Sequence, residues 1–195
     1  MKRGKLFLLI SVLIILFFSV LAISQKNYEF LAYSVIGALV VWLIYSTDKI
    51  YRYSNFAKIS FLIWIFLHFA GGLFRYNGKN WYSIILVNLV GEPYNILRYD
   101  QVLHFFFYFI TAIFIYSVII SFAEKNTSKF KLWLIIVLSA AGVGALNEIM
   151  EFGVYIYYEN SGVGTYINNA LDLVFNTLGA MLGAWIYLKK YTIKN

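Results

Sequence analysis

The sequence of 195 residues contains no cysteine and a single proline, Pro93, and only 13% of its residues are charged. Without cysteine, the chain has no disulfide framework and no thiolate metal site. A single proline argues against a Pro-rich linker or a second irregular domain. A soluble domain of this length would carry about 25% charged residues. The low charge is therefore the first sign that this is not a soluble protein.

Hydrophobic residues make up 62% of the chain, and the mean hydropathy is +0.73. The net charge of +7 is compatible with a nucleic-acid partner. However, the basic residues fall in short clusters between apolar runs, which is the pattern of membrane topology and not of a basic groove. We therefore predict an integral membrane protein whose partners are membrane lipids and not nucleic acid. The sequence leaves the oligomeric state open, a homo-oligomer included.

Six apolar runs predict an all-α bundle of six transmembrane helices in a single domain, residues 1–195. The expected spans are residues 6–23, 30–46, 59–74, 99–122, 131–155 and 170–188. A signal peptide is the competing interpretation of the first run, but its length exceeds the usual ~7–15 residues of a signal core, which favours a retained helix. Residues 81–90 are too few to cross a bilayer and predict a short interfacial or re-entrant segment. Trp81 and Tyr82 in this segment suit the headgroup layer.

The distribution of lysine and arginine predicts that both termini are cytoplasmic, in the cytoplasmic membrane. With the N-terminus inside, the outer segments hold four basic residues and the inner segments the other twelve of the sixteen. Such a bias sets the orientation of multi-pass proteins. The outer residues are Lys26, Arg75, Lys79 and Arg98; the inner ones are Lys2, Arg3, Lys5, Lys49, Arg52, Lys58, Lys125, Lys129, Lys131, Lys189, Lys190 and Lys194.

The stretch Asn147-Glu148-Ile149-Met150-Glu151 places two carboxylates and an amide inside the fifth apolar run. A charged side chain at membrane depth costs at least ~2.5–3.5 kcal/mol on insertion scales, so intramembrane acids are functional candidates by default. On a helix, residues three or four apart share one face. The three polar side chains must therefore meet other polar groups, water or a metal.

The predicted topology brings the other intramembrane polar residues to the same depth. His68 lies near the outer end of the third span, while Asp100 and His104 open the fourth and Asp172 and Asn176 open the sixth. At 1.5 Å per residue, all of them lie within roughly 10 Å of the outer ends of their helices. The inner halves of these spans carry no charged residues. We therefore predict one polar layer on the extracytoplasmic side.

Imidazole and carboxylate groups together suit zinc, manganese or iron, and a carboxylate-rich site also admits magnesium. Crowded carboxylates equally support acid–base chemistry. The predicted ligands of a divalent metal are His68, Asp100, His104, Glu148, Glu151 and Asp172. The predicted catalytic residues are His104, Glu148, Glu151 and Asp172, supported by Arg98, Asn147 and Asn176.

Each residue also has a structural interpretation. His68 alone could be a satisfied core histidine, and Asp100 and Asp172 could cap the fourth and sixth helices, because acids favour helix N-termini. Small residues repeat at helical spacing in the last two spans, as in Gly179 and Gly183. This pattern is typical of close helix packing and carries no function of its own.

Three motifs resemble a known family. Tyr99-Asp100-Gln101-Val102-Leu103-His104-Phe105 resembles the Asp-x-x-x-His-Phe opening shared by the YjdF-like family (DUF2238 membrane proteins) and the VanZ-like family. Residues 147–151 resemble the acidic helix that follows in the YjdF-like proteins, and residues 172–180 resemble the Asp-x-x-x-Asn-x-x-Gly-Ala segment that closes both families. The paired acids make the YjdF-like family the nearer match. The resemblance implies a multi-pass bundle and the same site residues, but it names no substrate.

Three functions follow as hypotheses. The leading one is an extracytoplasmic metal-assisted or acid–base centre, a hydrolase or transferase if it is an enzyme, which acts on or binds a lipid or lipid-linked envelope compound. A proton- or ion-coupled transporter is the second, disfavoured because the inner halves carry no charge and no internal repeat is evident. The third is a structural or partner-binding protein whose buried polar network only fixes helix packing.

Overall fold

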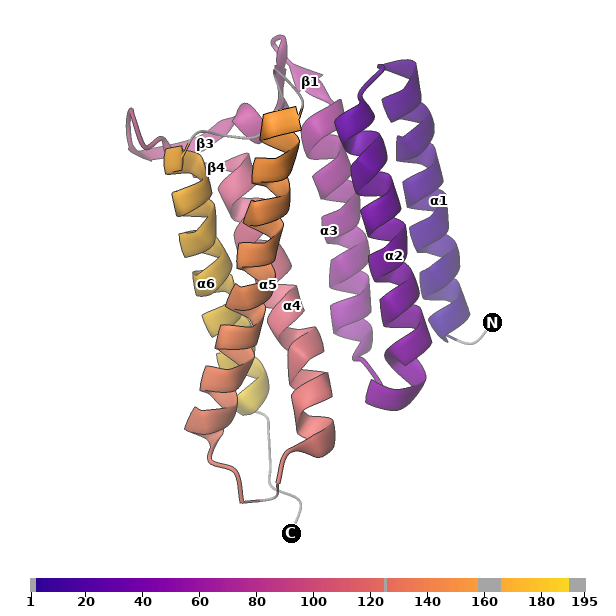
Figure 1. The fold of residues 1–195 in the computed structure, drawn as a ribbon, viewed down its shortest axis with the longest axis vertical. Coiled ribbons are helices and arrows are strands. Elements are labelled where there is room, and N and C mark those ends of the chain that lie inside the picture. Colours follow the sequence, from indigo (N-terminus) through magenta and orange to yellow (C-terminus); the bar gives the residue numbers. More distant parts are fainter. Residues whose placement is uncertain (1–2, 125, 158–165, 190–195) are drawn as a thin grey trace.

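The computed structural model describes residues 3–124, 126–157 and 166–189. The described chain forms six long helices: α1 (Arg3–Ser24), α2 (Tyr28–Tyr51), α3 (Asn55–Leu73), α4 (Tyr99–Phe122), α5 (Lys129–Tyr157) and α6 (Tyr166–Lys189), shown in Figure 1. Each contains a stretch long and apolar enough to cross a membrane. The predicted all-α membrane bundle of six helices is therefore confirmed.

The helices form two groups of three, α1–α3 and α4–α6, which we call the N-terminal half and the C-terminal half (Figure 1). The two halves join where α3 packs on α4. Aromatic side chains fill the core of the N-terminal half, where Phe18 stacks on Phe69 with 5.3 Å between ring centroids. In the C-terminal half the core contains smaller side chains, among them Ala112, Ala140, Ala180 and Ala184.

Most helices run further than the predicted spans. The second span was expected over residues 30–46, whereas α2 covers Tyr28–Tyr51. Hydropathy marks only the apolar middle of a helix, while the backbone hydrogen bonds continue through polar ends. Those ends are closed by capping side chains: Asn27 accepts from the N–H of Phe30, and Ser54 accepts from the N–H of Ala57.

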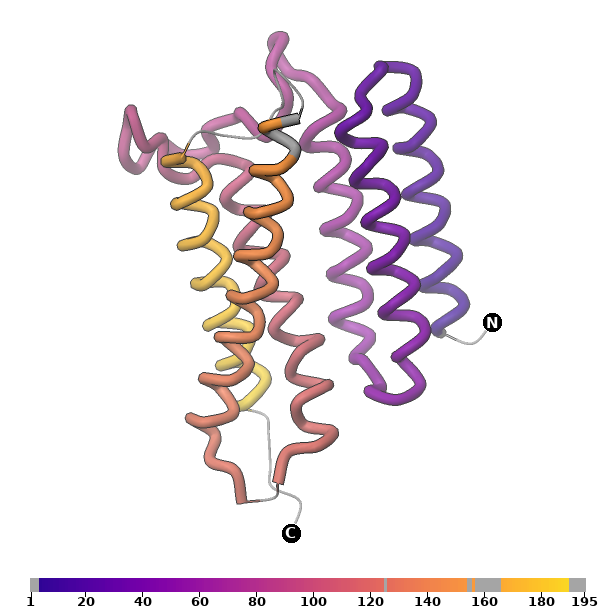
Figure 2. Tube along the Cα trace, viewed as in Figure 1, coloured from indigo at the N-terminus to yellow at the C-terminus, as the bar shows by residue number. Residues whose placement is uncertain are grey.

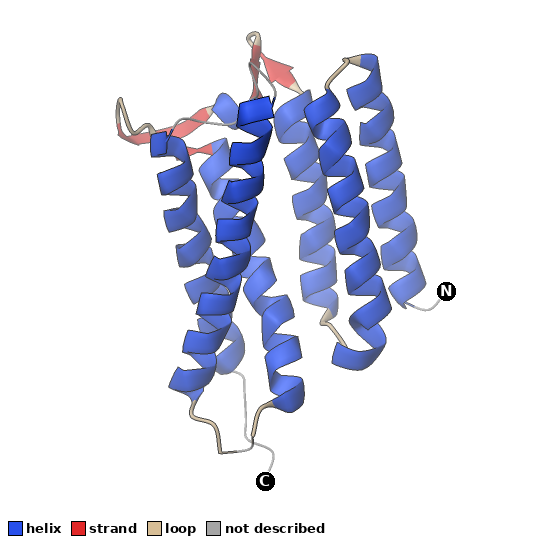
Figure 3. Ribbon diagram, viewed as in Figure 1, coloured by secondary structure: helices blue, strands red, loops and turns tan. Residues whose placement is uncertain are grey.

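Four short strands lie at one end of the bundle, which we call the hairpin end (Figure 3). β1 (Arg75–Tyr76) and β2 (Lys79–Asn80) pair antiparallel around Asn77-Gly78, both of which have positive φ. Asn-Gly is a favoured pair for such two-residue turns because both positions need φ > 0. α1 begins and α6 ends at the opposite, terminal end (Figure 2).

The segment predicted over residues 81–90 is a single 3-10 turn, η1 (Trp81–Ser83), followed by strand β3 (Ile85–Val90). β3 pairs antiparallel with β4 (Ile96–Arg98), and all six of its side chains are exposed. The β-branched residues of this stretch favour the extended backbone. The segment predicted as interfacial or re-entrant is thus a 3-10 turn followed by one strand of a hairpin at the end of the bundle.

Gly179 and Gly183 bring α6 against α4, the most extensive helix contact in the described chain. A Cβ atom at Gly179 would overlap the backbone carbonyl oxygen of Phe105, and one at Gly183 would overlap that of Phe109. The absence of side chains therefore lets the two backbones approach closely, as small residues do in membrane helices. This contact positions the polar residues of α6 beside those of α4.

Candidate functional site

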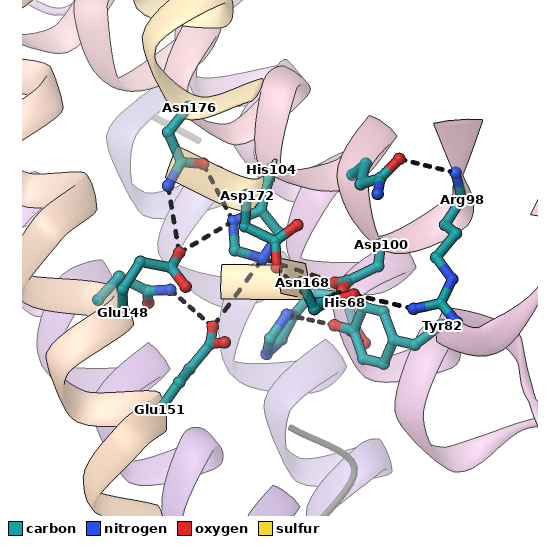
Figure 4. A network of polar contacts seen from close by, with 12 residues as sticks. His68, Tyr82, Arg98, Asp100, His104, Glu148, Glu151, Asn168, Asp172 and Asn176 are labelled. Carbon is teal, nitrogen blue, oxygen red and sulfur yellow. Dashed lines mark hydrogen bonds and ion pairs between the residues drawn. The ribbon is translucent and has the colours of Figure 1, made fainter. Parts of the chain in front are cut away.

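His104 is the centre of the polar residues in the C-terminal half (Figure 4). Its Nδ1 lies 3.0 Å from Asn176 Oδ1 and 3.5 Å from Glu148 Oε1. Its Nε2 lies 3.5 Å from Asp100 Oδ1 and 3.9 Å from Glu151 Oε1. With Asp172, these four ionisable residues form what we call the His104 cluster.

The hydrogen bonds of Asn176 fix the protonation of the ring. Its amide nitrogen donates to Glu148 Oε1 at 3.2 Å, so its oxygen faces His104. An amide oxygen only accepts, and therefore Nδ1 of His104 carries the proton and donates to Asn176. Nε2 is then the nitrogen that faces Asp100 and Glu151. The sequence predicted Asn176 as a supporting residue, and this contact is consistent with that role.

Asn168 links both sides of the cluster, and the sequence analysis missed it. Its Nδ2 donates to Asp100 Oδ2 at 3.2 Å and to Asp172 Oδ2 at 2.5 Å, and its Oδ1 accepts from Arg98 Nη1 at 2.9 Å. The spacing carried a signal, because Asn168, Asp172 and Asn176 lie four residues apart on one helix face. The predicted span began at residue 170 and left Asn168 outside.

Glu148 and Glu151 reach the cluster from α5, as their spacing predicted. Glu148 is 6% exposed, and Asn147 Nδ2 donates to Glu151 Oε1 at 2.7 Å. Gly144 makes room on the same helix, since a Cβ there would lie 3.2 Å from Asn176 Nδ2. The fifth helix therefore contributes the two acids and the amide that holds one of them.

The acids do not cap their helices. The first turn of α4 is closed by Gln101, whose Oε1 accepts from the N–H groups of Leu97 and Arg98 at 2.7 and 3.0 Å. Asp100 is left to face Asn168 and His104. Asp100 does lie in the first turn of α4, where an acid is favoured, but it makes no capping hydrogen bond. Asp172 lies six residues after Tyr166, the first residue of α6, and so outside the first turn. The capping interpretation is therefore wrong for Asp172.

His68 lies apart from the His104 cluster and contacts Tyr82. The Tyr82 hydroxyl lies 2.6 Å from His68 Nδ1 and donates to the backbone oxygen of His68 at 2.9 Å. Because a hydroxyl has one proton, Nδ1 of His68 must supply the proton of the shorter bond, which leaves Nε2 with a free lone pair. Burial, followed by the charges of Asp100 and Glu151, raises the pKa of Tyr82 well above its usual value, so the hydroxyl stays protonated.

Aromatic rings surround His68. The ring stacks on Trp64 with 5.0 Å between centroids and lies against Phe30 and Tyr33. Tyr82 therefore points into the bundle, whereas the sequence suggested the headgroup layer. No sequence pattern could have paired Tyr82 with His68, because a 3-10 turn after a hairpin places it there.

Two groups of ligand atoms within the cluster lie close enough to share an ion. Asp100, His104 and Asp172 form one, and His104, Glu148 and Glu151 form the other, with all atoms of a group within 4.8 Å of one another. His68 belongs to neither group. Of the six residues predicted as metal ligands, five therefore belong to the His104 cluster, and the sixth, His68, lies among aromatic rings.

A cavity of about 980 Å³ lies between the two halves and contacts both histidines. Its walls combine Asp100, His104, Asn147 and Glu151 of the C-terminal half with His68 and the aromatic residues of the N-terminal half. Toward the terminal end, the interior of the C-terminal half is apolar and buried, with residues such as Ile113, Leu132 and Ile136. Within the described part of the C-terminal half, the ionisable residues of the His104 cluster thus lie near the hairpin end.

A model of the family described as "Predicted membrane protein (DUF2238)" matches residues 5–192. The chain belongs to this family. The match covers all six helices and confirms the YjdF-like resemblance, whereas a VanZ-like relationship is not shown. No curated protein and no solved structure shows significant similarity to the chain. Membership of the DUF2238 family agrees with the six membrane-spanning helices and assigns no reaction.

Proposed function

We propose that the His104 cluster binds a divalent metal and that the cavity presents a lipid or lipid-linked compound to it. In this proposal the hairpin end faces the extracytoplasmic side. The excess of lysine and arginine near the terminal end supports that orientation. Of the basic residues counted there, Lys2, Lys125, Lys190 and Lys194 lie outside the described residues.

The observation that carries the metal proposal is a group of carboxyl groups that have no lysine or arginine partner in the described chain. Four carboxylates meet around one imidazole, and among the described residues all their ion pairs are with His104, none with a lysine or arginine. Arg98 reaches the cluster only through Asn168. Buried like charges are costly unless they are paired or coordinate a metal. A divalent cation would supply the missing positive charge.

Two buried oxygen atoms support the same conclusion independently. Glu148 Oε2 and Asp172 Oδ1 have no hydrogen-bond partner within the described chain, and Asp172 is 0% exposed. A buried acceptor without a partner costs about 1–3 kcal/mol, and more when it is charged. Metal coordination would satisfy oxygens of this kind.

The geometry fits a metal with nitrogen and oxygen ligands. Ligand atoms about 2.1 Å from a zinc ion lie roughly 3–3.5 Å from one another. His104 Nε2 and Asp100 Oδ1 are 3.5 Å apart, and Asp172 completes a group whose ligand atoms all lie within 4.8 Å of one another. Asn176 would orient the imidazole by accepting from Nδ1, the outer contact that metal-bound histidines usually make.

Such a site supports hydrolysis or group transfer. A divalent metal held by the His104 cluster would supply Lewis-acid and water-activating chemistry, and a base in the cavity would take the proton of the attacking water and return it to the leaving group of an ester or similar electrophile. His68 is suited to the role of base, because Tyr82 holds the ring so that Nε2 keeps its lone pair. Both histidines line the cavity, so a substrate bound there would contact both.

Elemental analysis of detergent-purified protein tests the metal proposal. The wild type is compared with His104→Ala, Glu148→Gln and Asp172→Asn after supplying zinc, manganese or magnesium. We expect near-stoichiometric metal in the wild type and its loss in all three variants. Asp48→Asn is the matched control, since Asp48 is an acid at the terminal end and pairs with Lys58 at 2.8 Å.

A wild type that binds none of the three metals would overturn the proposal. The polar residues would then form a structural network, and the same variants would lower thermal stability without changing any ligand binding. Dependence of ion uptake on Glu148 would instead indicate transport. The apolar interior toward the terminal end argues against transport, because a relay must reach both sides.

A further inference from the structure

The cavity has three tiers along the helix axes. Its apolar tier lies near the middle of the bundle, and it contains Ile36, Val40, Phe61, Ile65 and Phe107. The polar tier is formed by the two histidines with Asp100, Asn147 and Glu151. Closest to the hairpin end lies a basic tier, Lys26, Arg75 and Lys79, which we call the rim.

The rim is held by defined structure. Lys26 has φ +54° in the turn between α1 and α2, and this turn is tied to α3 by Gln25 Nε2, which donates to the backbone oxygen of Leu73 at 3.2 Å. Arg75 and Lys79 lie on the β1–β2 hairpin. Two separate supports thus place three cations around one opening of the cavity.

The rim carries free positive charge. All three side chains are exposed, and within the described chain none of them forms an ion pair. Glu29 also lines the opening, so the net charge of the four groups is 3 − 1 = +2. This charge lies opposite in sign to that of the His104 cluster deeper in the same cavity.

We propose that the cavity binds a phosphate-bearing amphiphile, with the phosphate at the rim, the neutral linkage at the polar tier and the hydrocarbon tail in the apolar tier. This inference rests on the proposed function and specifies its substrate class. The carboxylates repel a phosphate, so the anion belongs at the rim, where lysine and arginine bind phosphate oxygens.

The spacing of the tiers suits a glycerophospholipid. His68 lies five residues before the end of α3, so the polar tier is roughly 8 Å below the rim at 1.5 Å per residue. In a glycerophospholipid the ester groups follow the phosphate at about this distance, and the tails follow the esters. The bond presented to His104 and His68 would therefore be an ester next to the glycerol.

Facing walls of α2 and α5 offer the tail a way in from the membrane. Leu146, Ile149 and Met150 of α5 line the cavity and are 61%, 64% and 46% exposed. Across from them α2 contributes Ile36, Gly37 and Val40. Apolar residues that contact both the cavity and the lipid-facing surface are consistent with lateral entry of a hydrocarbon chain.

The test measures binding of short-chain lipids to detergent-purified protein by thermal stabilisation. The probes are dioctanoyl phosphatidic acid, dioctanoyl glycerol (the same tails without phosphate) and inorganic phosphate. We expect phosphatidic acid to bind at least about tenfold more tightly than either of the others, since each nearby basic residue strengthens the attraction several-fold. The triple variant Lys26→Gln/Arg75→Gln/Lys79→Gln should lose this preference.

The matched control neutralises three basic residues at the terminal end, Lys49→Gln/Arg52→Gln/Lys129→Gln, and should keep the preference. A second variant, Val40→Trp, fills the apolar tier and should weaken the binding of dioctanoyl phosphatidic acid more than the binding of inorganic phosphate. Equal binding of phosphatidic acid and dioctanoyl glycerol, or an unaffected rim variant, would overturn the proposal. If inorganic phosphate bound as tightly as dioctanoyl phosphatidic acid, the rim would bind the free anion, and the proposed amphiphile would be overturned.

Metal content measured on the same preparations separates the two proposals. A rim variant that keeps its metal but loses the phosphate preference supports both. A wild type that binds metal without any phosphate preference rejects only the substrate class. A wild type without metal that still prefers phosphatidic acid rejects the metal centre and retains the lipid site.

Discussion

The two halves of the bundle hold their helices together in different ways. In the N-terminal half, phenylalanine rings interlock between helices, and Phe18 alone contacts the rings of Phe66, Phe69 and Phe74. In the C-terminal half, Gly179 and Gly183 lie directly on the backbone of α4. Bulky rings fill the space between helices, whereas glycines remove that space. Only the second arrangement lets amides and carboxylates of one helix reach those of the next.

The two halves also differ in how their charged side chains are paired. The N-terminal half contains one buried ion pair, in which Lys58 Nζ lies 2.8 Å from Asp48 Oδ2 near the terminal end. The C-terminal half collects four acids around His104 at the hairpin end. Lys58 and Asp48 offset each other's charge, whereas the four carboxyl groups around His104 have no lysine or arginine partner within the described chain. The comparison teaches that the paired charges and the unpaired carboxyl groups lie in different halves.

We expect the largest effect from a variant that prevents α4 and α6 from approaching each other closely. Leucine at Gly179 would overlap the backbone of Phe105, which cannot yield as a side chain can, so we expect a loss of about 4 kcal/mol or more in unfolding free energy. Thermal unfolding in detergent and metal content measure it together. Gly142→Leu is the control, because a Cβ at Gly142 meets nothing within 4 Å. Equal stability of the two variants would contradict the packing argument.

Breaking the ion pair of the N-terminal half should cost less, without touching the site. Lys58→Met leaves the half-buried Asp48 without its cationic partner, and we expect a loss of about 2 kcal/mol, below the cost of breaking a fully buried pair. The double variant Lys58→Met/Asp48→Asn should recover most of it, because neither charge then remains. Denaturant unfolding of the three proteins provides the measurement. Loss of bound metal in Lys58→Met would show that the two halves are not independent.

Removing one acid from the His104 cluster should change stability in opposite directions with and without metal. Asp172→Asn relieves repulsion in the metal-free protein, with an expected gain of about 1 kcal/mol. It should also abolish metal-dependent stabilisation, which is about 2.7 kcal/mol at a metal concentration 100 times Kd. Melting temperatures with chelator and with added metal distinguish the two. Destabilisation under both conditions would favour a purely structural network.

We expect the smallest effect from a variant that tests whether His68 acts independently of the His104 cluster. Tyr82→Phe removes the hydroxyl that contacts His68 and should cost about 1 kcal/mol. Because burial raises the pKa of Tyr82 above its usual value of 10.0, the hydroxyl stays protonated and this cost should be constant from about pH 6 to pH 9. Metal content should match that of the wild type. Any loss of metal would mean that His68 supports the His104 cluster after all.

Much of the fold could be predicted because each helix is marked by the apolar pattern of its own segment. An apolar run of sufficient length must become a helix in a membrane, where every backbone group needs an internal hydrogen bond. The hairpins were harder to predict, since β3 reads as a short apolar patch and only its pairing with β4 makes it a strand. The acids were found because charge inside an apolar run is rare, whereas Asn168, Gln101 and Tyr82 are ordinary polar residues near helix ends.

The sequence by itself determined the six membrane helices, the family and the depth at which the acids lie, since hydropathy and helical spacing are properties of single segments. Only the tertiary structure decided which acids share His104, that His68 contacts Tyr82 outside the His104 cluster, and that Lys26, Arg75 and Lys79 line the same cavity. These relations join residues far apart in the chain. They depend on how closely α6 approaches α4 and on where two hairpins place their side chains, and no local pattern encodes either.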